Sequence, residues 1–336
     1  MTGFSLAEVE AARRTIEGTA IATPLVPSPY LTDLVGHDVL LKLEITQPIG
    51  AFKLRGATNA VFNLAPEVKG VTCCSTGNHG RGVAFAARAR GLRAVICMST
   101  LVPPAKLDGI KALGAEVRIV GASQDEASAE SRRLVGEEGL VEISPFDDAR
   151  VIAGQATIGL ELMAHRPDLA TVLVPLSGGG LAGGIALAVK HANPKIRVIG
   201  VSMDRGAAMY ESLKAGRPVE VEEVPSLADS LGGGIGLDNK LSFQLCRDHL
   251  DDVVLVSEAE IYRALQVLYY EDRLVAEGAA AVGPAALIAG KLPDLHGPAA
   301  AVITGRNVDM TVFTAIVNGG DVTLGDTILK GARYSA

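Results

Sequence analysis

Four short segments hold residues whose types and spacing could do chemistry, and the most distinctive is rich in glycine. An apolar stretch ends at Leu176, and Ser177, Gly178, Gly179 and Gly180 follow before a helical pattern begins. Glycines let backbone N–H groups surround an anion, and a helix N-terminus adds positive potential. The run indicates a phosphate-sized ligand, with a flexible turn as the alternative. It lacks the Gly-Lys-Ser/Thr of a P-loop and the GxGxxG spacing of a dinucleotide site.

The second segment is GAFKLRGATNA (residues 50–60), in which Lys53 and Arg55 flank Leu54 where a helix is expected to begin. A lysine in such a place is ordinarily a solvated surface residue. Beside a phosphate cradle, however, a lysine is what a pyridoxal phosphate enzyme requires, because the aldehyde of that cofactor forms a Schiff base with an amine. Lys53 is therefore a candidate for cofactor attachment.

The other two segments each follow an expected strand. STGNHG (residues 75–80) combines small polar side chains with an opening helix, which suits a substrate carboxylate, although helix capping by Ser75 or Asn78 is an equal alternative. TGRN (residues 304–307) places the Thr304 hydroxyl after a strand. Taken alone, this last segment would be an ordinary turn.

The elements that must position these segments alternate between strands and helices. Nearly continuous apolar runs predict strands covered on both faces, at residues 70–75, 94–99, 115–121, 171–177, 196–202 and 299–305. Helical spacing occurs at residues 82–91, 105–114, 128–139, 156–165 and 183–192. This alternation predicts an α/β fold with parallel sheets.

The predicted strands form two groups along the chain. One group lies between about residues 68 and 145, and the other contains the strands after residue 170 together with HDVLLKL (residues 37–43). We therefore expect a small inserted α/β domain, residues 68–145, within a large domain formed by residues 1–67 and 146–336. Ligands of such folds gather at the C-terminal ends of strands, so the cleft between the domains is the expected site.

Composition limits the partners and the compartment. A formal net charge of -7 without a basic run argues against nucleic acid and anionic membranes. The first 18 residues have the pattern of an amphipathic helix rather than a signal peptide, and no apolar run approaches the roughly 20 residues that span a bilayer. The four cysteines show no CxxC spacing, and Cys73 and Cys74 are adjacent. We expect a cytoplasmic protein.

Taken together, the four segments resemble the motifs of the fold-type II pyridoxal phosphate enzymes, specifically the serine/threonine dehydratase and serine racemase group. AFKLRGA resembles the lysine motif of that family, STGNHGRG its Ser-x-Gly-Asn-His loop, LSGGGLAGG its phosphate loop and ITGRNVD its closing motif. PFDDARVIAGQATIGLE (residues 145–161) and AEGAAAVG (residues 276–283) also resemble family segments. The resemblance covers nearly the whole chain. It implies a tryptophan-synthase-β-like fold, pyridoxal 5'-phosphate as the cofactor and a homodimer.

The resemblance also implies a role for each motif residue. The phosphate would be held through backbone N–H groups of five consecutive residues: Ser177, Gly178, Gly179, Gly180 and Leu181. The rest of the cofactor would contact Phe52 at a ring face, Lys53 at the aldehyde carbon, Asn78 at the ring hydroxyl, Glu277 near the ring and Thr304 at the pyridine nitrogen. The substrate carboxylate would be surrounded by Ser75, Thr76, Asn78 and His79. The catalytic residues would be Lys53 and Thr76.

These roles favour elimination. The neutral hydroxyl of Thr304 cannot donate a full proton to the pyridine nitrogen, so the ring would be a weaker electron sink and a β-substituent would leave readily. Lys53, once released by the substrate, would be the base at Cα. We expect an ammonia-lyase that removes hydroxide from a small hydroxy amino acid, such as threonine, serine or hydroxyaspartate, to give a 2-oxo acid and ammonia. The alternatives are a racemase on the same scaffold and a non-catalytic binding protein.

Several positions depart from the family pattern. Thr76 stands where racemases carry a second base and many dehydratases carry alanine, which leaves racemization open. Ser202 and Ala208 stand where racemases carry metal-binding carboxylates, so we expect no metal. Arg150 and Arg306 could hold a second acidic group on the substrate or could be solvated surface charges. The glycine-rich LADSLGGGIGLDN (residues 227–239) resembles the hydroxyectoine-degradation dehydratase, which would make a hydroxyectoine-derived amino acid the substrate.

Overall fold

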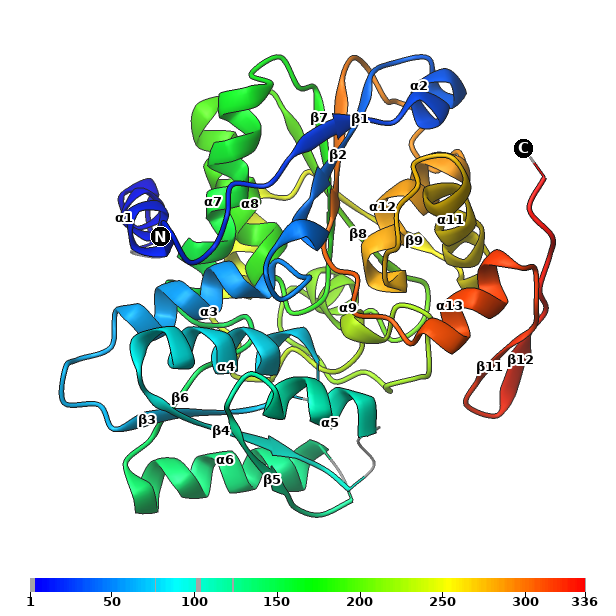
Figure 1. Ribbon diagram of the computed structural model, residues 1–336. Helices are drawn as coiled ribbons and strands as arrows, with labels where there is room; N and C mark the ends of the chain where they lie inside the picture. Colours follow the sequence, from blue (N-terminus) through cyan, green and yellow to red (C-terminus); the bar gives the residue numbers. More distant parts are fainter. Residues whose placement is uncertain (1–3, 76, 101–103, 123, 336) are drawn as a thin grey trace.

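The computed structural model describes residues 4–75, 77–100, 104–122 and 124–335, whose strands form two main sheets (Figure 1). The larger sheet has six strands in the spatial order β1-β2-β10-β7-β8-β9, and the smaller sheet has four in the order β5-β4-β3-β6. Neighbouring strands are parallel, except that β1 pairs antiparallel with β2. The predicted α/β fold with two parallel sheets is confirmed.

The larger sheet contains β1 (Leu25–Pro27), β2 (Val39–Leu43), β7 (Thr171–Pro175), β8 (Arg197–Met203), β9 (Asp252–Val256) and β10 (Ala299–Ile303). The smaller sheet contains β3 (Gly70–Cys74), β4 (Arg93–Met98), β5 (Glu116–Ile119) and β6 (Val141–Glu142). A hairpin near the C-terminus pairs β11 (Val322–Leu324) with β12 (Thr327–Leu329).

The helices are α1 (Leu6–Ile16), α2 (Pro29–Val35), α3 (Lys53–Phe62), α4 (Asn78–Arg90), α5 (Pro104–Lys111), α6 (Gln124–Glu138), α7 (Ala149–His165), α8 (Gly180–Ala192), α9 (Ala208–Ala215), α10 (Leu241–His249), α11 (Glu258–Tyr270), α12 (Gly278–Ile288) and α13 (Met310–Val317). Two short 3₁₀ helices, η1 (Glu44–Thr46) and η2 (Asp229–Leu231), follow strand β2 and precede α10.

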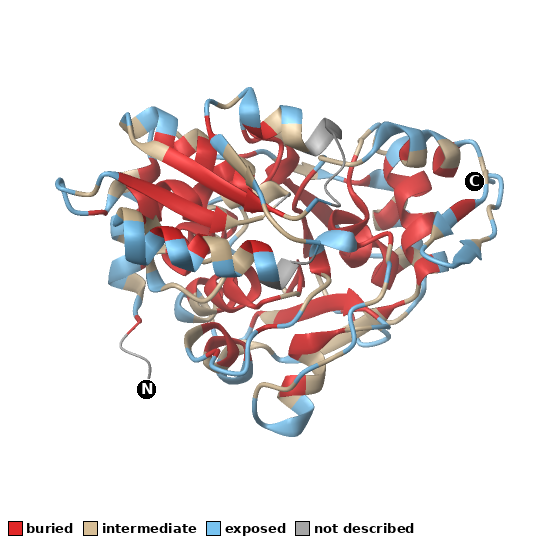
Figure 2. Cartoon of the chain, turned by 90° about the horizontal axis from the view of Figure 1, so that it is seen from below, coloured by how far each residue is buried: buried red, intermediate tan, exposed pale blue. Residues whose placement is uncertain are grey.

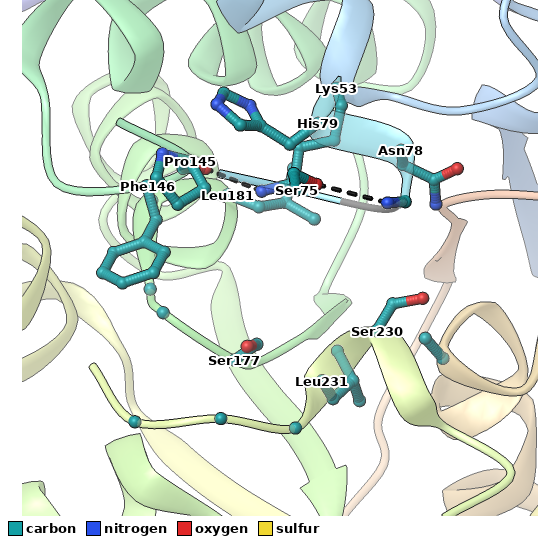
Figure 3. A pocket seen from close by; sticks show the side chains of 18 of the residues that line it. Lys53, Ser75, Asn78, His79, Pro145, Phe146, Ser177, Leu181, Ser230 and Leu231 are labelled. Carbon is teal, nitrogen blue, oxygen red and sulfur yellow. Dashed lines mark hydrogen bonds between the residues drawn. The ribbon is translucent and has the colours of Figure 1, made fainter. Parts of the chain in front are cut away.

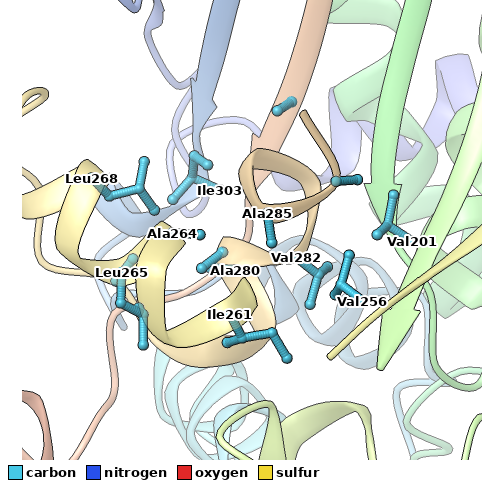
Figure 4. Close-up of a cluster of buried hydrophobic side chains, with 14 of the residues drawn as sticks. Val201, Val256, Ile261, Ala264, Leu265, Leu268, Ala280, Val282, Ala285 and Ile303 are labelled. Carbon is cyan, nitrogen blue, oxygen red and sulfur yellow. The ribbon is translucent and has the colours of Figure 1, made fainter. Parts of the chain in front are cut away.

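Helices cover both faces of the larger sheet. Side chains alternate along a strand, so Val172 and Val174 of β7 belong to the core shared with α8, whereas Leu173 belongs to the core shared with α11 and α12. Figure 4 shows the second of these cores, where Val201 and Ile303 of the sheet lie beside the two helices. Burial on both faces explains why these strand sequences are almost continuous in apolar residues.

The smaller sheet is covered in the same way. Ile96 of β4 shares a core with Val83 of α4, and Val95 shares another with Leu134 of α6. The strands of this sheet all lie between residues 70 and 142, but Ala57 of α3 also belongs to its core. The domain boundary at residue 67 therefore stays a proposal. Figure 2 shows buried strands at the centre of the chain and exposed residues on the outer helix faces.

Some elements differ from their predicted bounds. Helix α8 begins at Gly180 and α4 at Asn78, earlier than the spacing indicated, because the glycines of their first turns have low helix propensity and conceal the pattern. Strand β9 was not predicted, since it starts with aspartate and is only partly buried at the sheet edge. No described helix is long and apolar enough to cross a membrane.

Candidate active site

The ends of strands from both sheets meet at one large pocket with a volume of about 990 Å³. Three residues that line it, Ser75, Ser177 and Thr304, come soon after β3, β7 and β10, respectively. All three strands run parallel to their sheet neighbours. The loops that follow their C-terminal ends therefore lie at the same pocket, as expected for open α/β sheets.

The structure brings the predicted site residues together. Every one that is described lines this pocket: Phe52, Lys53, Ser75, Asn78, His79, Ser177, Gly178, Gly179, Gly180, Leu181, Glu277 and Thr304. Thr76, the second predicted catalytic residue, lies outside the described residues. Proximity supports the predicted site, while the role of each residue stays a prediction.

The glycine run forms a cradle at the start of α8. A Cβ atom at Gly178 would lie 2.3 Å from the ring of Phe146, and Gly179 has the left-handed φ of 85° that glycine adopts without strain. Among the described residues, no side chain caps the N-terminus of α8. The first backbone N–H groups of the helix therefore remain available for an anion.

Lys53 supplies an amine on another wall of the pocket. It is the first residue of α3, and its Nζ donates a hydrogen bond to the carbonyl oxygen of Pro145 at 2.6 Å (Figure 3). Burial lowers the pKa of Lys53 to about 8, partly offset by the negative charge of Glu277. A lowered pKa increases the fraction of neutral amine, which is the form that attacks an aldehyde.

A chain of hydrogen bonds fixes the side chain of Asn78. Its Nδ2 donates to Glu277 at 2.8 Å, and its Oδ1 accepts a bond of 2.6 Å from Asn307. Asn307 also donates to the carbonyl oxygen of Ile49. Sequence reasoning missed Asn307, although it lies in the ITGRNVD motif. The chain connects segments that are 199 and 229 residues apart, which no local pattern reveals.

Thr304 and Phe52 are joined through the backbone. The carbonyl oxygen of Thr304 accepts a hydrogen bond of 2.9 Å from the N–H of Phe52, which ties the end of β10 to the start of α3. The Thr304 side chain is buried and lines the pocket. Thr304 therefore contributes a hydroxyl, rather than a carboxylate, to the lining of the pocket.

His79 is buried in a neutral form. Its Nε2 lies 2.7 Å from the carbonyl oxygen of Ile143, so this nitrogen carries the proton and Nδ1 has only a lone pair. Burial lowers the pKa of His79 to about 3, and the charge of Lys53 acts in the same direction. The ring thus has no remaining N–H for a substrate carboxylate, and any contact to one would come from the backbone or the neighbouring loop. In that loop, the N–H of Gly77 donates to Ser75 Oγ at 3.3 Å.

Further residues complete the lining. Pro145 and Phe146 were not predicted individually, although they begin a segment that resembles the family. The glycine-rich segment at residues 227–239 contributes Ser230, Leu231 and backbone from Gly232 to Gly234, and Figure 3 shows Ser230 across the cavity from Lys53. The resemblance noted for this segment thus concerns residues that face the pocket.

The two arginines that were considered for a second acidic group do not line the pocket within the described residues. Arg150 pairs with Asp148 at 2.9 Å, and Arg306 is exposed. This favours the surface-charge interpretation. Ser202 and Ala208 are both buried, and the described residues contain no group of three side chains suited to a metal ion.

The groups around the pocket fit pyridoxal phosphate. The cradle of backbone N–H groups suits its phosphate, the Lys53 amine suits its aldehyde, and the hydroxyl of Thr304 suits its ring nitrogen. The close approach of Phe146 to Gly178 excludes side chains from the cradle, which is what a backbone-held phosphate needs. The fold and this set of groups define an enzyme of fold-type II that uses pyridoxal phosphate.

The chain belongs to the pyridoxal-phosphate dependent enzyme family, whose model matches residues 16–305. It is 54% identical to a provisionally named threonine dehydratase of Sinorhizobium fredii, over 95% of this chain and 97% of the other. It is 39% identical to the L-threonine ammonia-lyase of Thermotoga maritima, over 96% and 80% of the two chains. The structure of maize serine racemase matches with a TM-score of 0.88 at 31% identity, over 93% and 97%. The predicted family, fold class and cofactor are confirmed.

Proposed function

We propose that this enzyme is an ammonia-lyase that removes hydroxide from the β-carbon of a small hydroxy amino acid, threonine or serine in the first instance. The observation that carries the proposal is the shared pocket of Lys53, the glycine cradle and Thr304. The similarity to an L-threonine ammonia-lyase over 96% of this chain supports the same activity.

The proposed reaction assigns the transfer of the Cα proton to Lys53. Pyridoxal phosphate, when bound, supplies an aldehyde for the substrate amine and a ring that withdraws electrons from Cα. Lys53 takes the proton from Cα, for which its lowered pKa suits it near neutral pH. The β-hydroxyl leaves as water and takes up one proton, which balances the proton that Lys53 removes from Cα. The remaining enamine takes up water to give a 2-oxo acid and ammonia, so the net atoms balance.

Two other groups support elimination. Thr304 offers the ring nitrogen a neutral hydroxyl, which limits electron withdrawal and favours departure of the β-substituent. The loop from Ser75 to His79, at the start of α4, offers backbone N–H groups and a hydroxyl to the substrate carboxylate. Near both groups, the carboxylate of Glu277 accepts hydrogen bonds from Asn78 Nδ2 at 2.8 and 3.1 Å, which orients it on the wall of the pocket.

The experiment is cofactor trapping followed by a substrate panel. Purified protein loaded with pyridoxal phosphate is reduced with borohydride, and the labelled peptide is identified by mass spectrometry; we expect the label on Lys53 and none in Lys53→Ala. Ammonia release is then measured with serine, threonine, 3-hydroxyaspartate and hydroxyectoine-derived diamino acids. A label on another lysine, or no 2-oxo acid from any substrate, contradicts the proposal.

A racemase is the second candidate, because the likeness to maize serine racemase covers 93% of this chain. The discriminating measurement is chiral analysis of L-serine after incubation with the loaded enzyme. Appearance of D-serine faster than pyruvate would favour the racemase. We also propose a homodimer in solution, which light scattering of the loaded enzyme tests directly.

A further inference from the structure

Two residues beyond Lys53, the chain buries a cluster of four charged side chains that the proposed reaction does not use. This Arg55 cluster consists of Lys42, Glu44, Arg55 and Glu161. The side chains of Lys42 and Glu44 are fully buried, that of Arg55 is 1% exposed and that of Glu161 is 15% exposed. Two positive and two negative charges balance one another within it.

The guanidinium of Arg55 is held on two sides. Its Nε and Nη2 each lie 2.8 Å from an oxygen of Glu44, and its Nη1 lies 2.6 Å from Glu161. Thr157 adds a hydroxyl at 3.1 Å from Nη1. Lys42 Nζ meets the other oxygen of Glu161 at 2.5 Å. A planar fork bound to two carboxylates has one orientation, which a flexible ammonium would not have.

The cluster also holds the segment that precedes β1. The hydroxyl of Thr23 donates to Glu44 at 2.6 Å, and the carbonyl oxygen of Thr23 accepts from Lys42 at 2.6 Å. Arg55 Nη2 donates to the carbonyl oxygen of Ile21 at 3.2 Å. Glu44 follows β2, and Glu161 lies on α7. The segment before β1, the end of β2 and helix α7 therefore all meet the first turn of α3.

Helix geometry connects the cluster to the pocket. Residues two apart on an α-helix are separated by about 200° around its axis, so Lys53 and Arg55 point to nearly opposite sides of the first turn of α3. Lys53 faces the pocket (Figure 3), and Arg55 enters the protein interior. Any rotation or shift of this turn that moved the Lys53 amine would have to break the hydrogen bonds of Arg55.

We propose that Arg55, held by Glu44 and Glu161, is a positioning residue that fixes the place of the Lys53 amine in the pocket. Buried ion pairs are weak sources of stability compared with apolar packing, so their cost is better explained by the single geometry that they impose. This inference rests on the assignment of Lys53 in the proposed function.

The test compares Arg55→Lys with Val61→Ala. Arg55→Lys keeps the charge but loses the planar fork. Val61 is a buried apolar residue of the same helix that packs in the core of the smaller sheet. We expect Arg55→Lys to bind pyridoxal phosphate at least about 10-fold more weakly and to lower kcat about 100-fold, as misplacement by about 1 Å does. Val61→Ala should lower the melting temperature and leave cofactor affinity within about twofold.

The readouts separate positioning from folding. Cofactor affinity is measured from the visible absorption band, and borohydride labelling gives the rate at which the Lys53 amine captures the cofactor. If Arg55→Lys does not fold, the double variant Arg55→Met/Glu44→Gln takes its place. This variant removes one charge of each sign and leaves Lys42 paired with Glu161, so it should fold and show the same weakened capture.

Each result has a defined meaning. Label on a lysine other than Lys53 in the wild-type enzyme overturns the proposed function. Label on Lys53 in the wild-type enzyme, with equal capture rates and affinities in Arg55→Lys and Val61→Ala, overturns the positioning role alone. Slower capture in Arg55→Lys at a melting temperature equal to that of Val61→Ala supports it.

Discussion

At the scale of single residues, the environment of Lys53 decides when its amine can react. Burial lowers the pKa of this amine from 10.5 to about 8. The neutral amine predominates above the pKa, so in the cofactor-free protein the reactivity of Lys53 should rise with pH to half its maximum near pH 8. Competitive acetylation with acetic anhydride, read by mass spectrometry of the Lys53 peptide, measures this midpoint. A free lysine amide in the same tube is the control, and a shared midpoint would contradict the expected shift.

The same pKa has a consequence for stability. The unfolded chain binds more protons at Lys53 than the folded chain between about pH 8 and pH 10.5, so this residue makes the folded protein more stable as pH rises through that window. Below about pH 8, burial of the charged Lys53 amine lowers the free energy of unfolding by at most ~3 kcal/mol. Cofactor-free Lys53→Met should therefore be more stable than wild type at pH 7, with the difference shrinking towards pH 10.5. Urea unfolding at both pH values measures it, and a pH-independent difference would refute the argument.

At the scale of elements, local patterns predict the strands but not the contacts between distant loops. The apolar runs at β3, β7 and β10 were recognisable because both faces of each are buried. The motifs that follow them could therefore be placed at strand ends and assigned to one site. The bond from Asn78 to Glu277, by contrast, depends on how the two sheets pack. The Arg55 cluster could not be predicted either. In the sequence its charged residues look like ordinary surface residues, and only the fold brings them together.

The loop before α8 gives a prediction with a matched control. Gly179 has φ 85° and a Cβ there would lie 2.5 Å from Met209 Cε, whereas Gly216, after α9, has φ 69° and no atom within 4 Å of such a Cβ. Alanine should cost roughly 1–2 kcal/mol of stability at either position through left-handed strain. Only Gly179→Ala should also distort the cradle and weaken pyridoxal phosphate binding by about tenfold or more. Absorbance titrations of both variants decide this, and equal affinities would show that the cradle tolerates the displacement.

At the scale of the whole molecule, the pocket joins groups from both sheets. Asn78 begins α4 over the smaller sheet, while Gly180 begins α8 on the larger one, and Lys53 lies on α3 between them. A ligand that contacts all three ties the two sheets together. Its binding energy then adds to the stability of the complete fold, rather than to that of one loop.

Cofactor binding should therefore stabilise the enzyme as a unit. Pyridoxal phosphate at 100 times its dissociation constant should raise the free energy of unfolding by ~2.7 kcal/mol. Hydrogen exchange should slow at the start of α8, where backbone N–H groups would bind the phosphate, and at the start of α4, where the Asn78 side chain would contact the ring and steady the first turn. Pyridoxal, which has the aldehyde but no phosphate, is the control: at equal concentration it should protect α8 much less, since only the phosphate engages the cradle at Gly178 and Gly179. Equal protection of α8 by the two compounds would place the phosphate elsewhere.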